Sequence, residues 1–273
     1  MALAVEANLG LSANAQYGSD VVTLGAVASK LPIISDALVG AITSKNLFLG
    51  IFGINAAPSI LSNYNRPISS YISTLKAQSV IPSLSYGYTA GNQYRFNKIL
   101  GSLTLGGFDA SLFEPNDLTF KFNDNSNFDL TVHVGKISIS SNEGNKSLSS
   151  VSFSANVDST IPYLYLPIDV CKKFESAFHI TYDTASGLYL VNSTLHTKLL
   201  EQSANVTFTL TNSTGRALVD IVLPYQAFDL KAKWPLVKNS TRYFPLKRAA
   251  NNSQITLGRA FLQEAFVHMS NPI

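Results

Sequence analysis

The sequence predicts a mostly β fold with a few short helices. Apolar and polar residues alternate at positions 130–139, 151–157 and 206–210, which is the period of two that a half-buried strand requires. Two other stretches, at positions 67–78 and 168–178, instead place apolar side chains at helical spacing. A chain of 273 residues with 46% apolar residues is long enough for one large or two moderate domains with a substantial core.

The early part of the chain is predicted to alternate between strands and turns, with one helix. Residues 15–25 (AQYGSDVVTLG) predict a turn followed by a β-branched strand that ends at glycine. Residues 48–53 (FLGIFG) predict a buried apolar strand whose two glycines permit close backbone approach. Residues 67–78 predict a core-facing helix with Pro67 at its first position, and a strand-like pattern follows at positions 83–122.

The later part of the chain contains a second predicted helix. Positions 168–178 form an amphipathic pattern, and positions 181–266 are expected to contain strands and turns. The apolar face of the helix consists of Val170, Cys171, Phe174, Ala177 and Phe178. Cys171 is the one cysteine of the chain, so no internal disulfide can form, and we expect a buried structural thiol.

The composition indicates a surface that is polar but weakly charged. Charged residues make up 14% of the chain, below the roughly 25% of an average soluble protein. Ser, Thr and Asn provide the remaining polar surface, and six asparagines begin Asn-x-Ser/Thr triplets that can accept N-linked sugar. These candidates are Asn145, Asn192, Asn205, Asn212, Asn239 and Asn251. They favour a secretory route, although a chain rich in these residues also acquires such triplets through composition alone.

Charge and motif patterns exclude several function classes. The net charge of +3 and the lack of a basic run with interleaved aromatics argue against a nucleic-acid partner. No apolar stretch approaches the roughly 20 residues of a transmembrane helix. There is no phosphate-binding glycine-rich loop and no His/Cys set at zinc spacing, so we expect neither metal nor cofactor.

The candidate site residues lie between a strand and an apolar run. Asp158 follows the alternating segment that ends at Val157, and the hydroxyl residues Ser159 and Thr160 come directly after it. Backbone and hydroxyl hydrogen bonds can fix a carboxylate in such a position, where the apolar residues that follow exclude water. The alternative interpretation is that Asp-Ser is turn chemistry alone.

Five blocks of the chain resemble the pepsin-like aspartic proteases, in a form similar to that of secreted fungal members. The Asp158-Ser159-Thr160 segment resembles the second catalytic motif of the family. Four further blocks follow the family's order, at positions 48–53 (FLGIFG), 101–109 (GSLTLGGFD), 223–228 (LPYQAF) and 256–262 (TLGRAFL). The resemblance implies a bilobal acid protease fold, with residues 1–89 as the remainder of the first lobe from the flap onward and residues 90–273 as the second lobe.

The resemblance also implies roles for individual residues. Family members hydrolyse peptide bonds with two aspartates, one from each lobe, so that one acts as base towards water while the other donates a proton. Asp158 matches the second-lobe aspartate, and Ser159 matches a hydroxyl residue that ties the two catalytic loops together. Thr160 replaces the family's usual glycine. Residues 256–258 match the second lobe's apolar-apolar-Gly element, which would pass under the loop that bears Asp158.

The first aspartate of the family is not found in this sequence. No Asp precedes Asp20, and Asp20 and Asp36 lie outside an Asp-Thr/Ser-Gly motif. We therefore expect an aspartic-type endopeptidase family member with an incomplete first lobe that is inactive as this chain, and whether it is an enzyme stays open. The alternative is a non-catalytic extracellular glycoprotein that binds extended peptide or cell-wall material in the cleft.

The start of the chain lacks the features of a signal peptide. We expect roughly 60 to 100 further residues upstream, a size set by ordinary domain lengths, with a signal peptide and the first aspartate. The full-length protein is then expected to be secreted or at the cell surface, monomeric, and to take extended peptide or protein substrates.

Overall fold

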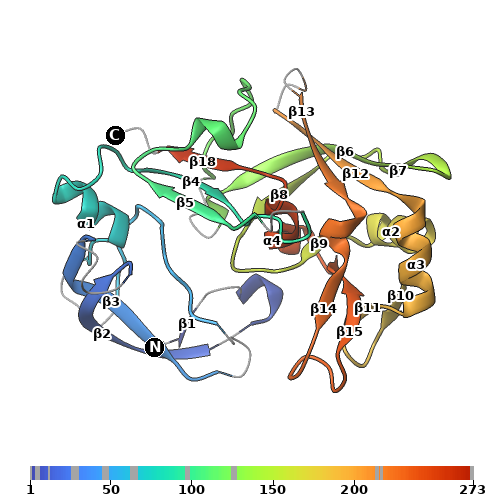
Figure 1. Ribbon diagram of the computed structural model, residues 1–273. Helices are drawn as coiled ribbons and strands as arrows, with labels where there is room; N and C mark the ends of the chain where they lie inside the picture. The colour runs from blue at the N-terminus through green and yellow to red at the C-terminus, as the bar shows by residue number, and fades with distance from the viewer. Residues whose placement is uncertain are drawn as a thin grey trace. The chain divides into compact units, whose positions relative to one another are not determined.

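The computed structural model describes residues 2–3, 7–11, 13–25, 31–44, 49–61, 67–95, 99–123, 128–212, 215 and 218–270. The chain divides into two compact units. The first consists of Met1–Tyr88, Leu103–Asp109 and Val267–Ile273, and the second of Thr89–Ser102 and Ala110–Phe266. The predicted mostly β fold with short helices is confirmed (Figure 1). The predicted lobe boundary near residue 90 stays a prediction.

The first unit contains two small antiparallel sheets. Strands β1 (Ala2–Leu3), β2 (Ala13–Thr23) and β3 (Ile33–Ile42) form one sheet in the order β1-β2-β3. Strands β18 (Val267–Ser270), β4 (Ser85–Thr89) and β5 (Ser102–Leu105) form the other. A 3-10 turn, η1, spans Ala7–Leu9.

Helix α1 (Tyr71–Ala77) supplies the core of the first unit. Its Ser70 N-cap accepts a hydrogen bond from Ser73 N, and Ile72 and Leu75 are buried. The predicted core-facing helix is therefore present, but it begins at Tyr71. The prediction that Pro67 is its first residue is wrong, because Ile68 pairs with Ser59 in an isolated β-bridge and keeps the preceding residues extended.

Two further predictions for the first unit are wrong. The turn expected at the start of residues 15–25 is part of strand β2, where Ala15 to Asp20 pair with β3. Residues 49–53 form no strand, and Leu49, Ile51 and Phe52 are exposed, because no described strand pairs with them. Phe48, the first residue of that predicted strand, lies outside the described residues.

The second unit is built around an eight-stranded sheet. Seven strands follow the order β13-β12-β6-β8-β17-β9-β16, and β7 pairs with β6. Their bounds are β6 Thr131–Ser141, β7 Gly144–Ser149, β8 Phe153–Val157, β9 Leu164–Pro167, β12 Asn205–Thr211, β13 Leu218–Pro224, β16 Leu246–Ala249 and β17 Thr256–Leu257. The three alternating segments of the sequence correspond to β6, β8 and β12, as predicted.

A second, four-stranded sheet and short helices complete this unit. The sheet has the order β10-β11-β15-β14, and α2 and α3 lie near one another beside it in Figure 1. The bounds are β10 Thr181–Asp183, β11 Leu188–Val191, β14 Leu230–Ala232, β15 Thr241–Phe244, α2 Ile168–Phe178, α3 Ser193–Gln202 and α4 Arg259–Leu262. Three 3-10 turns are η3 Ala110–Leu112, η5 Tyr225–Phe228 and η6 Asn252–Gln254.

Helix α2 agrees with its prediction, whereas α3 was missed. The five predicted core residues of α2 are all buried. The expectation of strands and turns at positions 181–266 is wrong for α3, which Asn192 caps by accepting a hydrogen bond from Leu195 N at 2.8 Å. Only Leu199 and Gln202 of α3 are buried, so its apolar pattern is weak.

Four phenylalanines form the centre of the second unit. Phe174 and Phe178 of α2 contact Phe228 and Phe244, with ring centroids between 4.6 and 6.5 Å apart. All four side chains are fully buried. This cluster packs α2 against η5 and against β15 of the four-stranded sheet.

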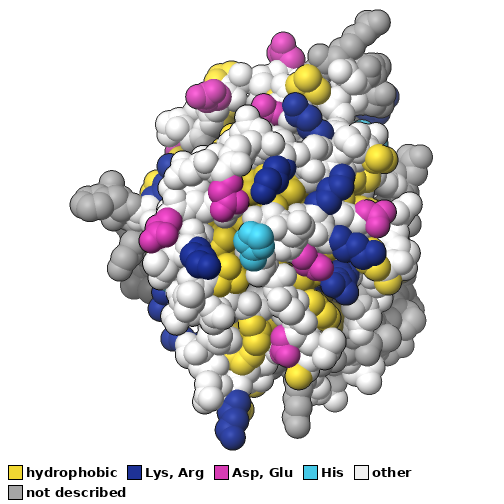
Figure 2. Space-filling view, turned by 90° about the vertical axis from the view of Figure 1, so that its right-hand side faces the viewer, with side chains coloured by type: hydrophobic (Ala, Val, Ile, Leu, Met, Phe, Trp, Pro, Cys, Tyr) yellow, Lys and Arg dark blue, Asp and Glu magenta, His cyan; other side chains and the backbone are white. Residues whose placement is uncertain are grey.

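The surface that carries α2 and α3 is mixed in charge. Figure 2 shows basic and acidic side chains interspersed there with uncharged atoms and small hydrophobic areas. No described helix is long and apolar enough to cross a membrane.

The first unit exposes apolar side chains that favour self-association. Leu49 and Ile60 are 75% and 80% exposed. We expect the double substitution Leu49→Ser/Ile60→Ser to reduce concentration-dependent light scattering at neutral pH. Val151→Ser is the matched control, because Val151 is equally exposed at 75% but lies in the second unit. Equal scattering of the double variant and the wild type would contradict the expectation.

Cys171 is expected to be unreactive while the protein is folded. Its thiol is fully buried and donates to Leu166 O and Lys247 O, and burial raises its pKa to about 12. Since the thiolate is the reacting form, a disulfide reagent should find no thiol at about pH 7 or pH 9, although an ordinary cysteine would ionise over that range. Unfolding in urea should release one thiol per chain. Rapid labelling of the folded protein would show that α2 opens locally.

Candidate active site

The backbone around Asp158 is held by a strand from the end of the chain. Strand β17 lies between β8 and β9, where Leu257 pairs in parallel with Val157 and antiparallel with Leu164. Asp158 N donates to Leu257 O at 3.2 Å. The apolar-apolar-Gly element 256–258 thus passes beside the loop that bears Asp158, as the family resemblance implies.

Gly258 allows the chain to pass this loop closely. A Cβ atom at this position would lie 2.3 Å from both Ile161 O and Tyr163 O, which is closer than any real side chain allows. Gly258 N instead donates to Tyr163 O at 3.0 Å. A glycine is required here by close approach between backbone atoms.

The carboxylate of Asp158 is oriented by Thr160. Thr160 donates twice to Asp158 Oδ1, from its backbone N at 2.8 Å and from its hydroxyl Oγ1 at 2.6 Å. In the described part of the chain, Oδ2 of Asp158 has no hydrogen-bond partner. Thr160 therefore adds a donor that glycine lacks, and both of its donors act on the same carboxylate oxygen.

Ser159 contributes to the loop through its backbone. Its carbonyl accepts a hydrogen bond from Arg259, while its hydroxyl makes none with the described residues of the second unit. The role that the resemblance implies for this hydroxyl, tying two loops together, stays a prediction.

Arg259 is a positioning residue that sequence reasoning did not identify. Its Nη1 donates to Ser159 O at 2.6 Å and to Thr160 O at 2.8 Å, and its backbone N donates to Ile161 O at 2.7 Å. One residue thus binds three consecutive carbonyls of the loop. Its place in the block 256–262 was visible in the sequence, but nothing in that block indicates where the side chain points.

A cluster of tyrosines and a lysine adjoins the loop. The ring of Tyr163 lies 6.1 Å from that of Tyr243, and Lys247 Nζ lies 4.8 Å from the centre of the Tyr163 ring. Burial raises the pKa of Tyr163, raises that of Tyr243 to about 12, and lowers that of Lys247. These tyrosines therefore stay protonated over the range in which carboxylates titrate and supply apolar surface beside the Asp158 loop.

The other residues considered in the sequence are the two early aspartates of the first unit and the six acceptor asparagines of the second unit. Asp20 and Asp36 are on the exposed β2–β3 hairpin, where Asp20 accepts from Val21 N and Asp36 accepts from the Ser19 hydroxyl. Among the six acceptor asparagines, Asn212 is half-buried and the others are exposed. In the described ranges, no three His, Cys, Asp or Glu side chains are grouped as metal ligands.

Comparisons with known proteins identify the fold and the family of this chain. The crystal structure of aspartic proteinase from Irpex lacteus matches with a TM-score of 0.62 over 95% of this chain and 75% of that chain. Sequence identity is 18%, so this match shows the fold, which is that of a pepsin-like aspartic proteinase. A sequence model of the family described as eukaryotic aspartyl protease matches residues 5–271, and the chain belongs to this family. No curated protein sequence matches significantly.

Removing the Arg259 side chain is expected to destabilise the second unit. The two hydrogen bonds from a charged donor to loop carbonyls suggest that Arg259→Ala lowers the free energy of unfolding by about 2 to 4 kcal/mol. Arg259→Lys keeps the charge but not the fork of donors, so its loss should be smaller. Denaturant unfolding measures both, with Lys172→Ala, an exposed residue of α2, as the control. Equal stability of Arg259→Ala and the wild type would show that water replaces the guanidinium.

Proposed function

We propose that this chain carries one half of an aspartic endopeptidase site, with Asp158 as its catalytic carboxylate and Ser159 and Thr160 as loop support. The observation that carries the proposal is the geometry of Asp158, whose Oδ1 takes two donors from Thr160 while Oδ2 has no partner in the described chain. Membership of the eukaryotic aspartyl protease family supports peptide bonds as the substrate.

The chemistry requires a second carboxylate. In an aspartic dyad, two carboxyl groups share one proton, so that one removes a proton from water while the other protonates the substrate, and their titration belongs to the pair. Asp20 and Asp36 are engaged by local partners on an exposed hairpin, and neither is followed by the motif that a first-lobe aspartate needs. We therefore infer that this chain alone does not hydrolyse peptides.

We further propose that the protein follows the secretory route, as a glycoprotein of the secreted fungal type. Exposure of Asn145, Asn192, Asn205, Asn239 and Asn251 supports this, since an acceptor must be accessible. Substrates would be extended peptides or proteins, because an extended segment offers main-chain hydrogen bonds and alternate side chains to a cleft.

Peptide cleavage at acid pH tests the proposal. The purified chain is expected to release no fragments from a mixed peptide library above the background of Asp158→Asn, because a single carboxylate cannot share a proton. Calorimetry with the same peptides should detect binding that Asp158→Asn weakens. Cleavage that disappears in Asp158→Asn would show that another group completes the site. Binding that does not depend on Asp158 would favour the alternative, a non-catalytic glycoprotein.

A further inference from the structure

An open pocket of the second unit lies at one end of β12 and β13. It has a volume of about 640 Å³ and is lined by Asn205, Asp220, Val222, Gln226, Tyr94 and Glu264, together with neighbouring residues. Asp158 is not among its lining residues. This pocket is therefore separate from the candidate active site.

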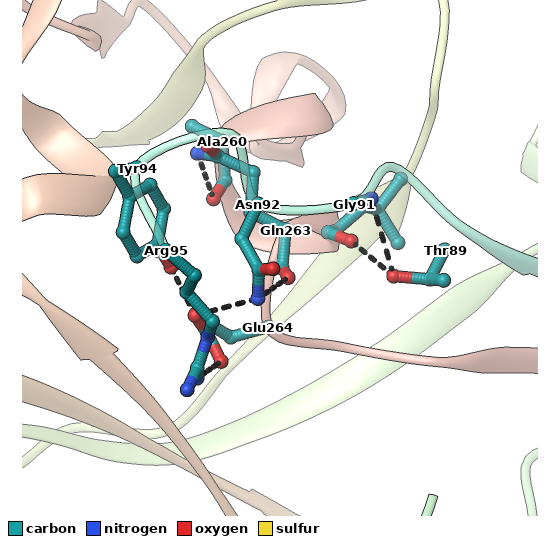
Figure 3. Close-up of polar contacts among 9 residues, drawn as sticks. Thr89, Gly91, Asn92, Tyr94, Arg95, Ala260, Gln263 and Glu264 are labelled. Carbon is teal, nitrogen blue, oxygen red and sulfur yellow. Dashed lines mark hydrogen bonds and ion pairs between the residues drawn. The ribbon is translucent and has the colours of Figure 1, made fainter. Parts of the chain in front are cut away.

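One wall of the pocket is rigid because a carboxylate joins its side chains. Glu264 accepts hydrogen bonds from the Tyr94 hydroxyl and, at 3.1 Å, from Asn92 Nδ2, and it forms an ion pair with Arg95 at 2.5 Å (Figure 3). The Glu264 side chain is 10% exposed, whereas that of Arg95 is 50% exposed. The wall thus presents a fixed tyrosine ring and a guanidinium to solvent.

Asn205 differs from the other acceptor asparagines in lining this pocket. It begins the triplet Asn205-Val206-Thr207, it is exposed, and its amide has no hydrogen-bond partner in the described chain. By contrast, the amide oxygens Oδ1 of Asn192 and Asn251 accept backbone hydrogen bonds that cap α3 and η6. Neither Asn145 nor Asn239 lines this pocket.

We propose that the pocket holds the first sugars of an N-linked glycan on Asn205. The inference rests on glycosylation of Asn205 and is independent of peptide hydrolysis. The pocket falls within the roughly 300 to 1,000 Å³ of small-molecule sites, and its polar side chains suit a ligand that offers hydroxyl and amide groups. The Tyr94 ring supplies an apolar surface for the C–H face of a sugar ring.

The attachment itself follows from the acceptor chemistry. The donor is an oligosaccharide linked to a lipid pyrophosphate in the secretory pathway. Asn205 Nδ2 loses a proton and forms a bond to C1 of the first sugar, while the bond from C1 to the pyrophosphate breaks and the lipid pyrophosphate takes the proton. The tethered sugar needs no further translational ordering to reach the pocket, because it is already attached at the rim.

Protection of the glycan from an endoglycosidase tests the proposal. The chain is expressed behind a signal peptide in a eukaryotic host, and glycan release is followed at each triplet by mass spectrometry. We expect glycan release from Asn205 in the folded protein to be at least about tenfold slower than from Asn239. The combined net free energy of a few hydrogen bonds exceeds the free energy that corresponds to a tenfold change in an equilibrium constant. The two rates should converge after unfolding.

Matched variants test whether the pocket wall that contains Tyr94 causes the protection of the Asn205 glycan. Tyr94→Ala removes the ring and should abolish the protection, whereas Tyr94→Phe keeps the ring and should retain most of it. Trp234→Ala is the control, because Trp234 is 82% exposed and does not line the pocket. Thr207→Val removes the acceptor hydroxyl and should lower the melting temperature of the glycosylated protein, whereas Thr207→Ser keeps the triplet and should not.

Two results would overturn the proposal. An unmodified Asn205 in a protein whose Asn239 carries sugar would show that the pocket does not hold a glycan. Equal release from Asn205 and Asn239 in the folded protein would show that the sugar extends into solvent. Peptide cleavage has no bearing on either result, so failure here leaves the proposed peptidase chemistry standing.

Discussion

The insertion of β17 between β8 and β9 is the constraint on which the candidate site depends. Two residues, Thr256 and Leu257, satisfy backbone groups on both neighbouring strands, and the next residue must lack a side chain to clear two carbonyl oxygens. The Asp158 loop is therefore fixed by main-chain geometry. Side chains then refine its position, with Thr160 acting on the carboxylate and Arg259 acting on the loop carbonyls.

Thr160 shows how a departure from a family pattern can be accommodated. The third residue of the motif keeps the backbone donor that a glycine would supply, and its hydroxyl adds a second donor to the same oxygen. Arg259 donates hydrogen bonds to the carbonyl oxygens of Ser159 and Thr160 in the same loop. The departure thus changes how the carboxylate is held without removing the backbone contact at its base.

The sequence predicts those parts of the structure in which local pattern and burial agree. Helix α2 and strands β6, β8 and β12 are strongly periodic and pack into one core, so their patterns and their environments match. The prediction of a buried strand is wrong for residues 49–53, because hydrophobicity indicates burial only where partner strands exist. Helix α3 was missed because the prediction relied on apolar periodicity, and only Leu199 and Gln202 of this helix are buried. The Asn192 cap is the clearer sequence signal for this helix. The role of Arg259 could not be predicted, because it depends on hydrogen bonds to Ser159 and Thr160, about a hundred positions earlier in the chain. No pattern in the residues next to Arg259 indicates such a distant contact.

The late position of β17 in the chain also affects the order of folding during synthesis. Strands β8 and β9 leave the ribosome about a hundred residues before the segment that must enter between them. Until then the middle of the sheet has an open gap, and contacts between such distant residues form slowly. The Asp158 loop therefore acquires its final shape only after β17 has emerged. A nascent polypeptide cannot present an ordered Asp158 carboxylate to its neighbours before Thr256 and Leu257 have left the ribosome.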